Sequence, residues 1–360
     1  MTKTRHFIQD INIRAIQAPL ARPIKTASGN VPVAPLILID LTTNQGIVGT
    51  SYIFGYTPLT LRPLIEIFKN LKDLLIGKSI SPHARMQEFE ATFRLLGRQG
   101  LLGMALSGLD MACWDALARA QNLPLAELLG GSCKPIPAYD SYGIFNPKAD
   151  AAQIEQSLAQ GFKAIKIKVG DGNLQRDVDA IAGLRHIIGD DICLMIDYNQ
   201  SLSVPEAIRR INRLAEFDLH WVEEPVLAED LSGHAHVRRK TNVAIQTGEN
   251  WWFPEDAARA IDAKACDFAM LDIMKIGGIT GWLRAAGQAD GASLPVSSHL
   301  FAEASAHVLA VTQGAHWLEY LDIASLILQD PIAIKDGTLT ARGPGLGLEW
   351  DEDAVAKYAL

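Results

Sequence analysis

Hydrophobic positions recur with two different spacings along the chain, and the spacing changes near residue 134. Before that point, β-branched runs at residues 6–17, 35–41 and 46–53 predict three strands, with Asn44-Gln45-Gly46 as a hairpin turn. Apolar residues then recur at every third or fourth position, which predicts three helices. The first two are marked by Leu61, Leu64, Ile65, Phe68, Leu71 and Leu75 and by Met86, Phe89, Phe93 and Leu96, and the third covers 101–121. The first third of the chain is therefore predicted to be an α+β unit.

From about residue 134 onward, short apolar runs alternate with amphipathic stretches. The runs are PIPAYDSYG, KAIKIKVG, CLMIDYNQ, HWVEEP, VAIQTGE, FAMLDIMK, LPVSSHL and AHWLEYLD. Eight strands separated by helices predict an α/β fold with a parallel barrel of the TIM type, and an open doubly wound sheet is the structural alternative. The tail around Gly343-Pro344-Gly345 predicts a loop and a terminal segment that packs back on the chain.

Composition narrows the class of protein. The formal net charge of -8 disfavours both a nucleic acid and an anionic membrane as partner, because each needs a basic surface. No apolar run approaches the ~20 residues that span a bilayer, and the charged N-terminal stretch is not a secretory signal. The four cysteines form no CxxC pair, which is typical of reduced residues in a cytoplasmic protein. A small anionic substrate stays compatible with this charge, because a metal ion can reverse the local field.

Charged residues interrupt the apolar runs where the predicted barrel strands end. Seven successive strands supply Lys166 and Lys168, Asp197, Glu223, Glu249, Asp272, His299 and Glu319. From Lys168 onward the steps are 29, 26, 26, 23, 27 and 20 residues, each close to the length of one βα unit. Strand ends of a parallel barrel meet at its mouth, where barrel enzymes carry their chemistry. The spacing therefore predicts one shared site.

Three consecutive strands in this series end in carboxylates, Asp197, Glu223 and Glu249. Neighbouring strands lie ~4.8 Å apart, so the three groups should converge on one point. Without a cation they would repel each other, and at least one would take up a proton. Ligands that are all oxygen suit a hard ion, so we expect Mg²⁺, with Mn²⁺ also possible.

Two bases are predicted on opposite sides of this metal. Lys166 and Lys168 lie on one face of a strand, and each ammonium group should lower the pKa of the other, which makes Lys168 a candidate base. His299 is the second candidate, because Asp272 on the neighbouring strand would fix its tautomer. One base could remove a proton from a substrate carbon while the other returns a proton to the opposite face. Glu319 could donate a hydrogen bond to the substrate carboxylate as negative charge develops.

These residues lie in motifs that resemble the enolase superfamily, and specifically the mandelate racemase/muconate lactonizing enzyme family. The motifs KxK, DYNQ, EEP, GEN, DxMKIGG and SSHL occur in this order, and PLILIDL, SYIFGYTP and LDMACWDALA extend the likeness over nearly the whole chain. The resemblance implies a (β/α)7β barrel at 133–335 and an α+β capping domain at 1–132, whose loop at about 22–33 selects the substrate. The carboxyl segment, 336–360, would return to the capping domain.

The resemblance also implies a role for each matching residue. Asp197, Glu223 and Glu249 would be the metal ligands, Lys168 and the His299–Asp272 pair the two bases, Lys166 the modulator of Lys168, and Glu319 the electrophilic acid. The substrate would be contacted by Ser141, Asn199, Lys275, Ile24, Val31, Phe54, Tyr56, Leu300 and Leu321. Family members form symmetric oligomers, so a homo-oligomer, an octamer by this likeness, is expected.

The implied activity is racemisation of a small-molecule carboxylate, namely a 2-hydroxy acid such as mandelate or a close aryl analogue. An acid-sugar dehydratase that uses the same metal site is the alternative. The apolar wall of the pocket disfavours a polyol, but the polar residues Arg22, Lys25 and Ser28 of the 22–33 loop keep this alternative open. A binding protein without catalysis is a third reading, which the retention of every matching catalytic residue disfavours.

Overall fold

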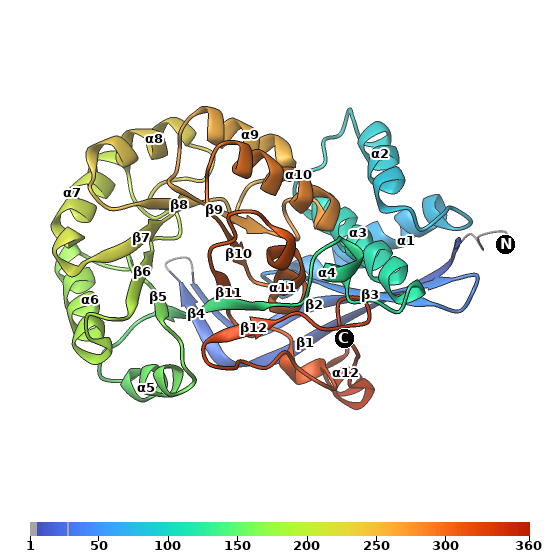
Figure 1. Cartoon of the computed structure of the whole chain (residues 1–360), viewed down its shortest axis with the longest axis horizontal. Coiled ribbons are helices and arrows are strands. Elements are labelled where there is room, and N and C mark those ends of the chain that lie inside the picture. The colour runs from blue at the N-terminus through green and yellow to red at the C-terminus, as the bar shows by residue number, and fades with distance from the viewer. Residues whose placement is uncertain (1–5, 27–28) are drawn as a thin grey trace.

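The computed structural model describes residues 6–26 and 29–360. The chain forms a curled sheet ringed by helices and, beside it, a smaller three-stranded sheet with its own helices (Figure 1). Ser28, one of the polar residues that bear on the dehydratase alternative, lies outside the described residues.

The smaller unit is an antiparallel sheet in the order β1-β2-β3 with helices packed on it. Its strands are β1 (Ile8–Thr26), β2 (Gly29–Thr43) and β3 (Val48–Phe54). Its helices are α1 (Leu61–Leu75), α2 (Pro82–Thr92), α3 (Leu101–Ala120) and the short α4 (Leu125–Leu128), with a 3₁₀ turn at Pro58–Thr60. The predicted α+β character is therefore confirmed, as is the hairpin turn between β2 and β3, where Gly46 N donates to Thr43 O.

Three expectations for this unit are wrong. The described parts of the 22–33 segment are strand and not loop, because β1 runs to Thr26, β2 begins at Gly29, and Ile24 pairs with Val31 in this hairpin arm; the prolines at 19, 23, 32 and 35 hid this strand pattern. Leu96 lies beyond the end of α2 and is 76% exposed, because the helix ends at Thr92. The expectation that no apolar run approaches a membrane-spanning length is also wrong, because among the described residues α3 is long and apolar enough to cross a membrane. Most of α3 is buried, so it is a core helix of the fold.

The larger unit is a parallel sheet in the order β10-β9-β8-β7-β6-β5-β4-β11. Its strands are β4 (Pro135–Ile144), β5 (Ala164–Lys168), β6 (Cys193–Asp197), β7 (Leu219–Glu223), β8 (Ile245–Thr247), β9 (Phe268–Asp272), β10 (Val296–His299) and β11 (Leu318–Tyr320). Backbone bonds from Ser298 N to Trp317 O and from His316 N to Val296 O join β10 to β11 and close the ring. All eight predicted strands are present, and closure excludes the doubly wound alternative.

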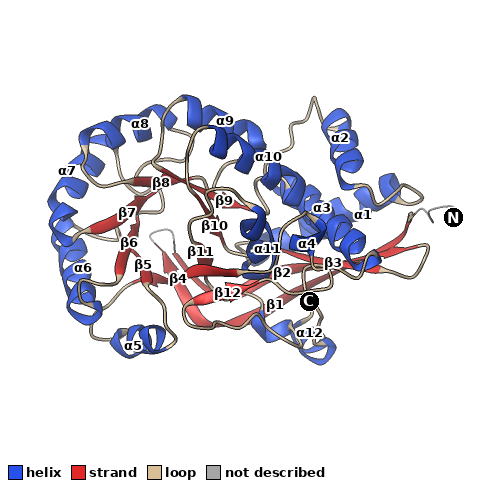
Figure 2. Cartoon of the chain, viewed as in Figure 1, coloured by secondary structure: helices blue, strands red, loops and turns tan. Residues whose placement is uncertain are grey.

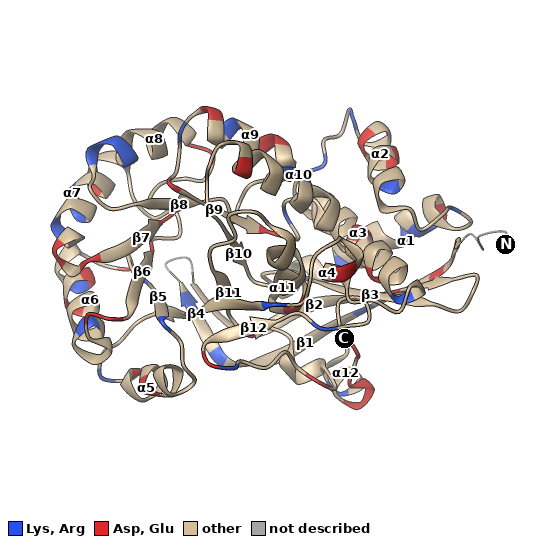
Figure 3. Ribbon diagram, in the orientation of Figure 1, with Lys and Arg blue, Asp and Glu red and all other residues tan. Residues whose placement is uncertain are grey.

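Helices ring the outside of this barrel (Figure 2). They are α5 (Ala151–Ala159), α6 (Leu174–Ile188), α7 (Val204–Leu214), α8 (Leu231–Lys240), α9 (Phe253–Asp262), α10 (Gly278–Gly291) and α11 (Ala302–Val311), with 3₁₀ turns at Ala215–Phe217 and Ser325–Ile327. Acidic and basic residues are interspersed along α6 and α7 (Figure 3). The helices thus present a solvated outer face, while their inner faces bury the strands.

The carboxyl tail touches both units. It adds β12 (Thr338–Thr340) antiparallel to β4, a strand that the sequence pattern did not predict. It then forms α12 (Glu352–Tyr358), after which Leu360 N donates to Ala15 O on β1. Trp350 Nε1 also donates to Asp40 on β2. The domain boundaries given above remain predictions.

Candidate active site

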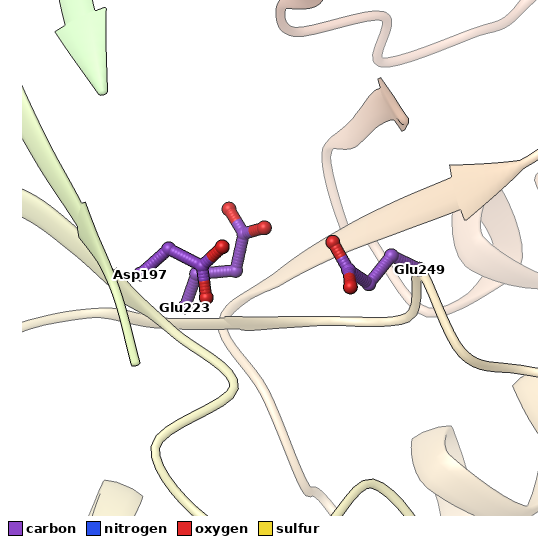
Figure 4. A group of neighbouring side chains, drawn as sticks. All are labelled: Asp197, Glu223 and Glu249. Atoms are coloured by element: carbon purple, nitrogen blue, oxygen red, sulfur yellow. The ribbon is translucent and has the colours of Figure 1, made fainter. Parts of the chain in front are cut away.

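The register of the barrel strands brings the predicted carboxylates together. Lys168 pairs with Asp197 across β5 and β6, and Asp197 with Glu223 across β6 and β7. Glu249 follows β8 after Gly248, whose φ of +132° and close approach to Met270 O leave no room for a Cβ. Carboxylate oxygens of Asp197, Glu223 and Glu249 all lie within 4.8 Å of one another, and the side chains converge (Figure 4).

Each carboxylate of this trio is buried and has basic neighbours. Asp197 accepts from Lys168 Nζ at 2.5 Å and from Asn199 Nδ2 at 2.8 Å. Glu223 accepts from Lys166 Nζ at 2.8 and 3.0 Å. Glu249 lies with its Oε2 3.2 Å from His299 Nε2. The site is therefore dense in charge and sheltered from water.

The donor set fits a hard divalent cation. Burial, and after it the nearby carboxylates Asp197 and Glu249, raises the pKa of Glu223 well above its ordinary value, although Lys166 opposes the shift. A divalent ion bound to the oxygens would remove this repulsion. Three buried carboxylates with no sulfur or imidazole ligand favour Mg²⁺ or Mn²⁺ over softer ions.

Lys166 and Lys168 both reach the rim from β5, whose five residues are all buried. Lys166 Nζ bridges Glu223 and Glu319, at 2.8 Å from each. The expected low pKa of Lys168 is not observed. Burial and Lys166 lower that pKa, but Asp197, at 2.5 Å, together with Glu249 and Glu223 raises it, and the net shift is upward. A cation on Asp197 would weaken this attraction and so favour the neutral amine.

His299 and Asp272 form the predicted pair. They are register partners on β10 and β9, and His299 Nδ1 lies 2.6 Å from Asp272 Oδ2. The other oxygen of Asp272 accepts the backbone N–H groups of Met274 and Lys275, which fixes the carboxylate. Burial lowers the pKa of His299, but Glu249 and Asp272 raise it further, so the net shift is upward.

The surroundings of Glu319 favour its ionised form, whereas an electrophilic acid must carry a proton. Its Oε1 lies 2.8 Å from Lys166 Nζ, and its Oε2 accepts from Leu300 N at 3.0 Å. Burial would raise the pKa of Glu319, but Lys166 and His299 outweigh burial and hold it at about 2. Glu319 could act as a hydrogen-bond donor only after a substrate carboxylate entered beside it and raised its pKa.

A cavity of about 400 Å³ opens beside the trio. Lys168, Glu249 and His299 line it together. Of the predicted substrate residues it is lined by Asn199, Lys275, Ile24, Val31, Phe54, Tyr56, Leu300 and Leu321. Ser141 does not line the cavity; it is buried on β4 beside Lys166, and its backbone carbonyl accepts from Arg22 Nη2.

Arg22 and Lys25 do not line this cavity either. The Arg22 guanidinium bonds to Asp140 and lies 3.9 Å from the centre of the Tyr142 ring. Lys25 faces a different pocket, which it shares with Arg176 and Asp171. The two cationic residues that kept a sugar acid open as substrate therefore do not point into this cavity. Arg22 is paired with Asp140, and Lys25 lies on the part of the hairpin arm that faces the other pocket.

Comparison with known proteins places this geometry in a family. A model described as enolase C-terminal domain-like matches residues 149–354, and the mandelate racemase/muconate lactonizing enzyme N-terminal domain model matches residues 8–130. The chain belongs to the mandelate racemase/muconate lactonizing enzyme family. The resemblance found in the sequence motifs is therefore confirmed, and the protein is an enzyme of the enolase superfamily.

Relatives within the family differ in the reactions that their names state. The chain is 54% identical to a crystallised enolase from Bradyrhizobium in complex with magnesium and mandelic acid, with a TM-score of 0.98 and coverage of 100% of both chains. It is 31% identical to 3,6-anhydro-alpha-L-galactonate cycloisomerase from Streptomyces coelicolor, over 90% of this chain and 91% of the relative. It is 30% identical to L-talarate/galactarate dehydratase from Salmonella typhimurium, over 72% and 66%. Family membership alone therefore does not fix the substrate.

Several polar residues of this family member's cavity were missed from the sequence. The cavity is also lined by Thr26, Asn30, Gln200 and Asn250. Asn250 connects the site, since its amide donates to Glu224 and Glu249 and its oxygen accepts from Lys275 Nζ. Its place directly after Glu249 was the available signal. Thr26 and Asn30 lie in the 22–33 segment that was expected to select the substrate, but only the pairing of β1 with β2 shows that these two residues reach the cavity.

Proposed function

We propose that the protein is a Mg²⁺-dependent racemase of a 2-hydroxy acid, mandelate or a close aryl analogue. The observation that carries the proposal is the presence of two bases, Lys168 and His299, on one cavity beside the carboxylate trio. A substrate carbon between the two bases could lose its proton from one face and regain one on the other. The 54% identical relative that holds magnesium and mandelic acid supports this choice of substrate.

Asp197, Glu223 and Glu249 would hold the ion. Bound there, Mg²⁺ would supply positive charge that stabilises the negative charge developing on the substrate carboxylate. Lys166, already shared between Glu223 and Glu319, contributes a fixed ammonium group on the same side.

The protons are handled by this chain's own residues. His299 Nδ1 is held against Asp272, so the proton that His299 takes up and gives back is the one on Nε2, the nitrogen that lies beside Glu249 at the cavity. Lys168 takes the α-proton from the other enantiomer. In each direction the opposite base, already protonated, delivers a proton to the far face. Once the negative charge of the substrate carboxylate has raised the pKa of Glu319, the protonated Glu319 would donate a hydrogen bond to that carboxylate.

The cavity wall favours an aromatic group. Ile24 and Val31 project from the hairpin arm, and Phe54, Tyr56, Leu300 and Leu321 continue the apolar lining. The Phe54 and Tyr56 rings lie 4.9 Å apart, which provides an edge against which an aryl ring can pack.

An acid-sugar dehydratase is the second candidate. Amides of Asn30, Asn199, Gln200 and Asn250 line the same cavity and could bind hydroxyl groups. The relative named L-talarate/galactarate dehydratase supports this reading. A dehydratase would remove the same α-proton but would expel a β-hydroxyl group, so the two candidates give different products.

Proton NMR in D₂O with polarimetry tests the proposal. With Mg²⁺, both (R)- and (S)-mandelate should lose the α-proton signal while their optical rotation decays. A chelator should stop both processes, and added Mg²⁺ should restore them. Silence on mandelate and on substituted aryl 2-hydroxy acids, together with 2-keto product from an acid sugar, would replace the racemase by the dehydratase.

A further inference from the structure

Two histidines face each other at the closed end of the barrel, away from the catalytic rim. His220 is the second residue of β7, and His316 lies two residues before β11. In the closed ring of eight strands, β7 and β11 stand on opposite sides. The Nε2 atoms of the two imidazoles are 3.3 Å apart. The pair therefore bridges the floor of the barrel from one wall to the other.

A β-bulge aims His220 at this point. Along the β6–β7 register, Leu194 pairs with Leu219 and the next residue, Met195, pairs with Trp221, so His220 is left without a register partner. An extra residue of this kind redirects its side chain, and bulges are frequent at functional positions. The His220 ring then stacks on Phe268 at 5.6 Å between centroids, and the His316 ring lies 4.7 Å from the same ring.

The separation of the two nitrogens suits a shared metal ion. Between the two imidazoles alone, this contact is a hydrogen bond at the long end of the range, since N–H···O bonds are usually about 2.7–3.2 Å. Two imidazole nitrogens bound at about 2.0–2.1 Å in tetrahedral geometry stand roughly 3.3–3.4 Å apart. We propose that His220 and His316 form a binding site for a divalent transition-metal ion that prefers imidazole, such as Zn²⁺ or Ni²⁺.

The protonation state agrees with this geometry. Burial lowers the pKa of His316 to about 4 and also lowers the pKa of His220, which the exposed Asp218 only partly opposes. Both rings are therefore neutral near pH 7, the form that binds metals.

The proposed two-histidine site would bind its ion more weakly than the carboxylate trio at the rim, and with nitrogen in place of oxygen ligands. Among residues 6–26 and 29–360, the rim trio is the one group of three or more His, Cys, Asp or Glu side chains arranged to hold an ion. Water must complete the coordination of an ion held by two imidazoles, so binding is reversible and removed by chelators. A bound ion would link β7 to the start of β11 across the barrel. Trp221, next to His220, extends from this floor and donates to the rim carboxylate Glu223 at 3.3 Å.

Calorimetric titration with Zn²⁺, in excess Mg²⁺ so that the rim is filled, tests the site. The wild-type protein should bind one equivalent. His220→Gln and His316→Gln should each weaken binding by roughly tenfold or more, since even the outer partners of a metal ligand contribute about 10–100-fold. His236→Gln removes an exposed histidine from α8 and should bind as the wild type does.

Tryptophan fluorescence gives a local readout. Rings of Trp221 and Trp317 lie 5.2 Å from His220 and 6.0 Å from His316, so paramagnetic Ni²⁺ should quench them in the wild type and His236→Gln but not in the two site variants. Equal Zn²⁺ affinity and equal quenching in all four proteins would overturn the proposal. So would a Zn²⁺-soaked wild-type crystal without anomalous density between His220 and His316, a result that does not depend on how the variants fold.

Discussion

At the scale of single residues, the rim is built from buried charges that neutralise one another. Lys166 and Lys168 are 0% and 8% exposed, and each touches a carboxylate that is fully buried. Removing one partner of such a pair leaves an unpaired buried charge, which typically costs about 3–5 kcal/mol. Loss of activity in a charge-deleting variant must therefore be separated from loss of folding.

Asp272→Asn makes this separation for the histidine base. The amide keeps an oxygen that can accept from the backbone of Met274 and Lys275, but its NH₂ group then faces His299 Nδ1 and favours the tautomer that is protonated at Nε2. Proton removal by His299 should fall by about 10²–10⁴-fold, the usual contribution of a general base. Deuterium exchange of each mandelate enantiomer measures this, with exchange through Lys168 as the internal control. Undiminished exchange with both enantiomers would refute the role of Asp272.

At the scale of elements, α3 anchors the capping sheet by packing directly on its strands. Gly49 on β3 permits this contact, because a Cβ there would lie 2.1 Å from Ala112 O and 2.7 Å from Ala116 Cβ. The same helix also contacts the barrel, because Asp110 of α3 accepts from Thr280 N and Oγ1 at the start of α10. One helix thus joins the capping sheet to the barrel.

Gly49→Ala tests this packing. The added methyl group meets backbone rather than a flexible side chain, so the variant should lose about 1–3 kcal/mol of unfolding free energy. Gly287→Ala is the matched control: it lies inside α10, a Cβ there meets nothing within 4 Å, and helix propensity predicts a gain of about 1 kcal/mol. Urea unfolding of the three proteins measures both changes. Equal stability of Gly49→Ala and the wild type would show that α3 can move away from β3.

At the scale of the whole molecule, much of the fold was predictable because the barrel repeats one unit. Seven of the eight predicted barrel strands supply a charged residue near their ends, and parallel strands bring such ends to one rim, so Asp197, Glu223 and Glu249 could be placed together. Contacts made between distant segments could not be predicted. The hairpin arm over the cavity, the pairing of β12 with β4 and the bulge at His220 all depend on register, which no local pattern states.

The charge states and ion-pair partners of the site residues could not be predicted from the sequence either. Spacing correctly placed Lys166 beside Lys168, but the sign of the net pKa shift of Lys168 depends on Asp197, which only the folded barrel brings to 2.5 Å. Likewise Arg22 could be counted toward a polar pocket until its partner Asp140 was known. Pairing across strands, rather than the residue types themselves, decided these points.

The most direct test of the two-base account compares Lys168→Ala and His299→Ala, each with Mg²⁺ and each mandelate enantiomer in D₂O. We predict that neither variant racemises mandelate, and that each still exchanges the α-proton of one enantiomer, the enantiomer being opposite for the two variants. Circular dichroism of both variants provides the control for folding. If each variant lost exchange with both enantiomers, or kept exchange with both, Lys168 and His299 would not be bases on opposite faces of the substrate.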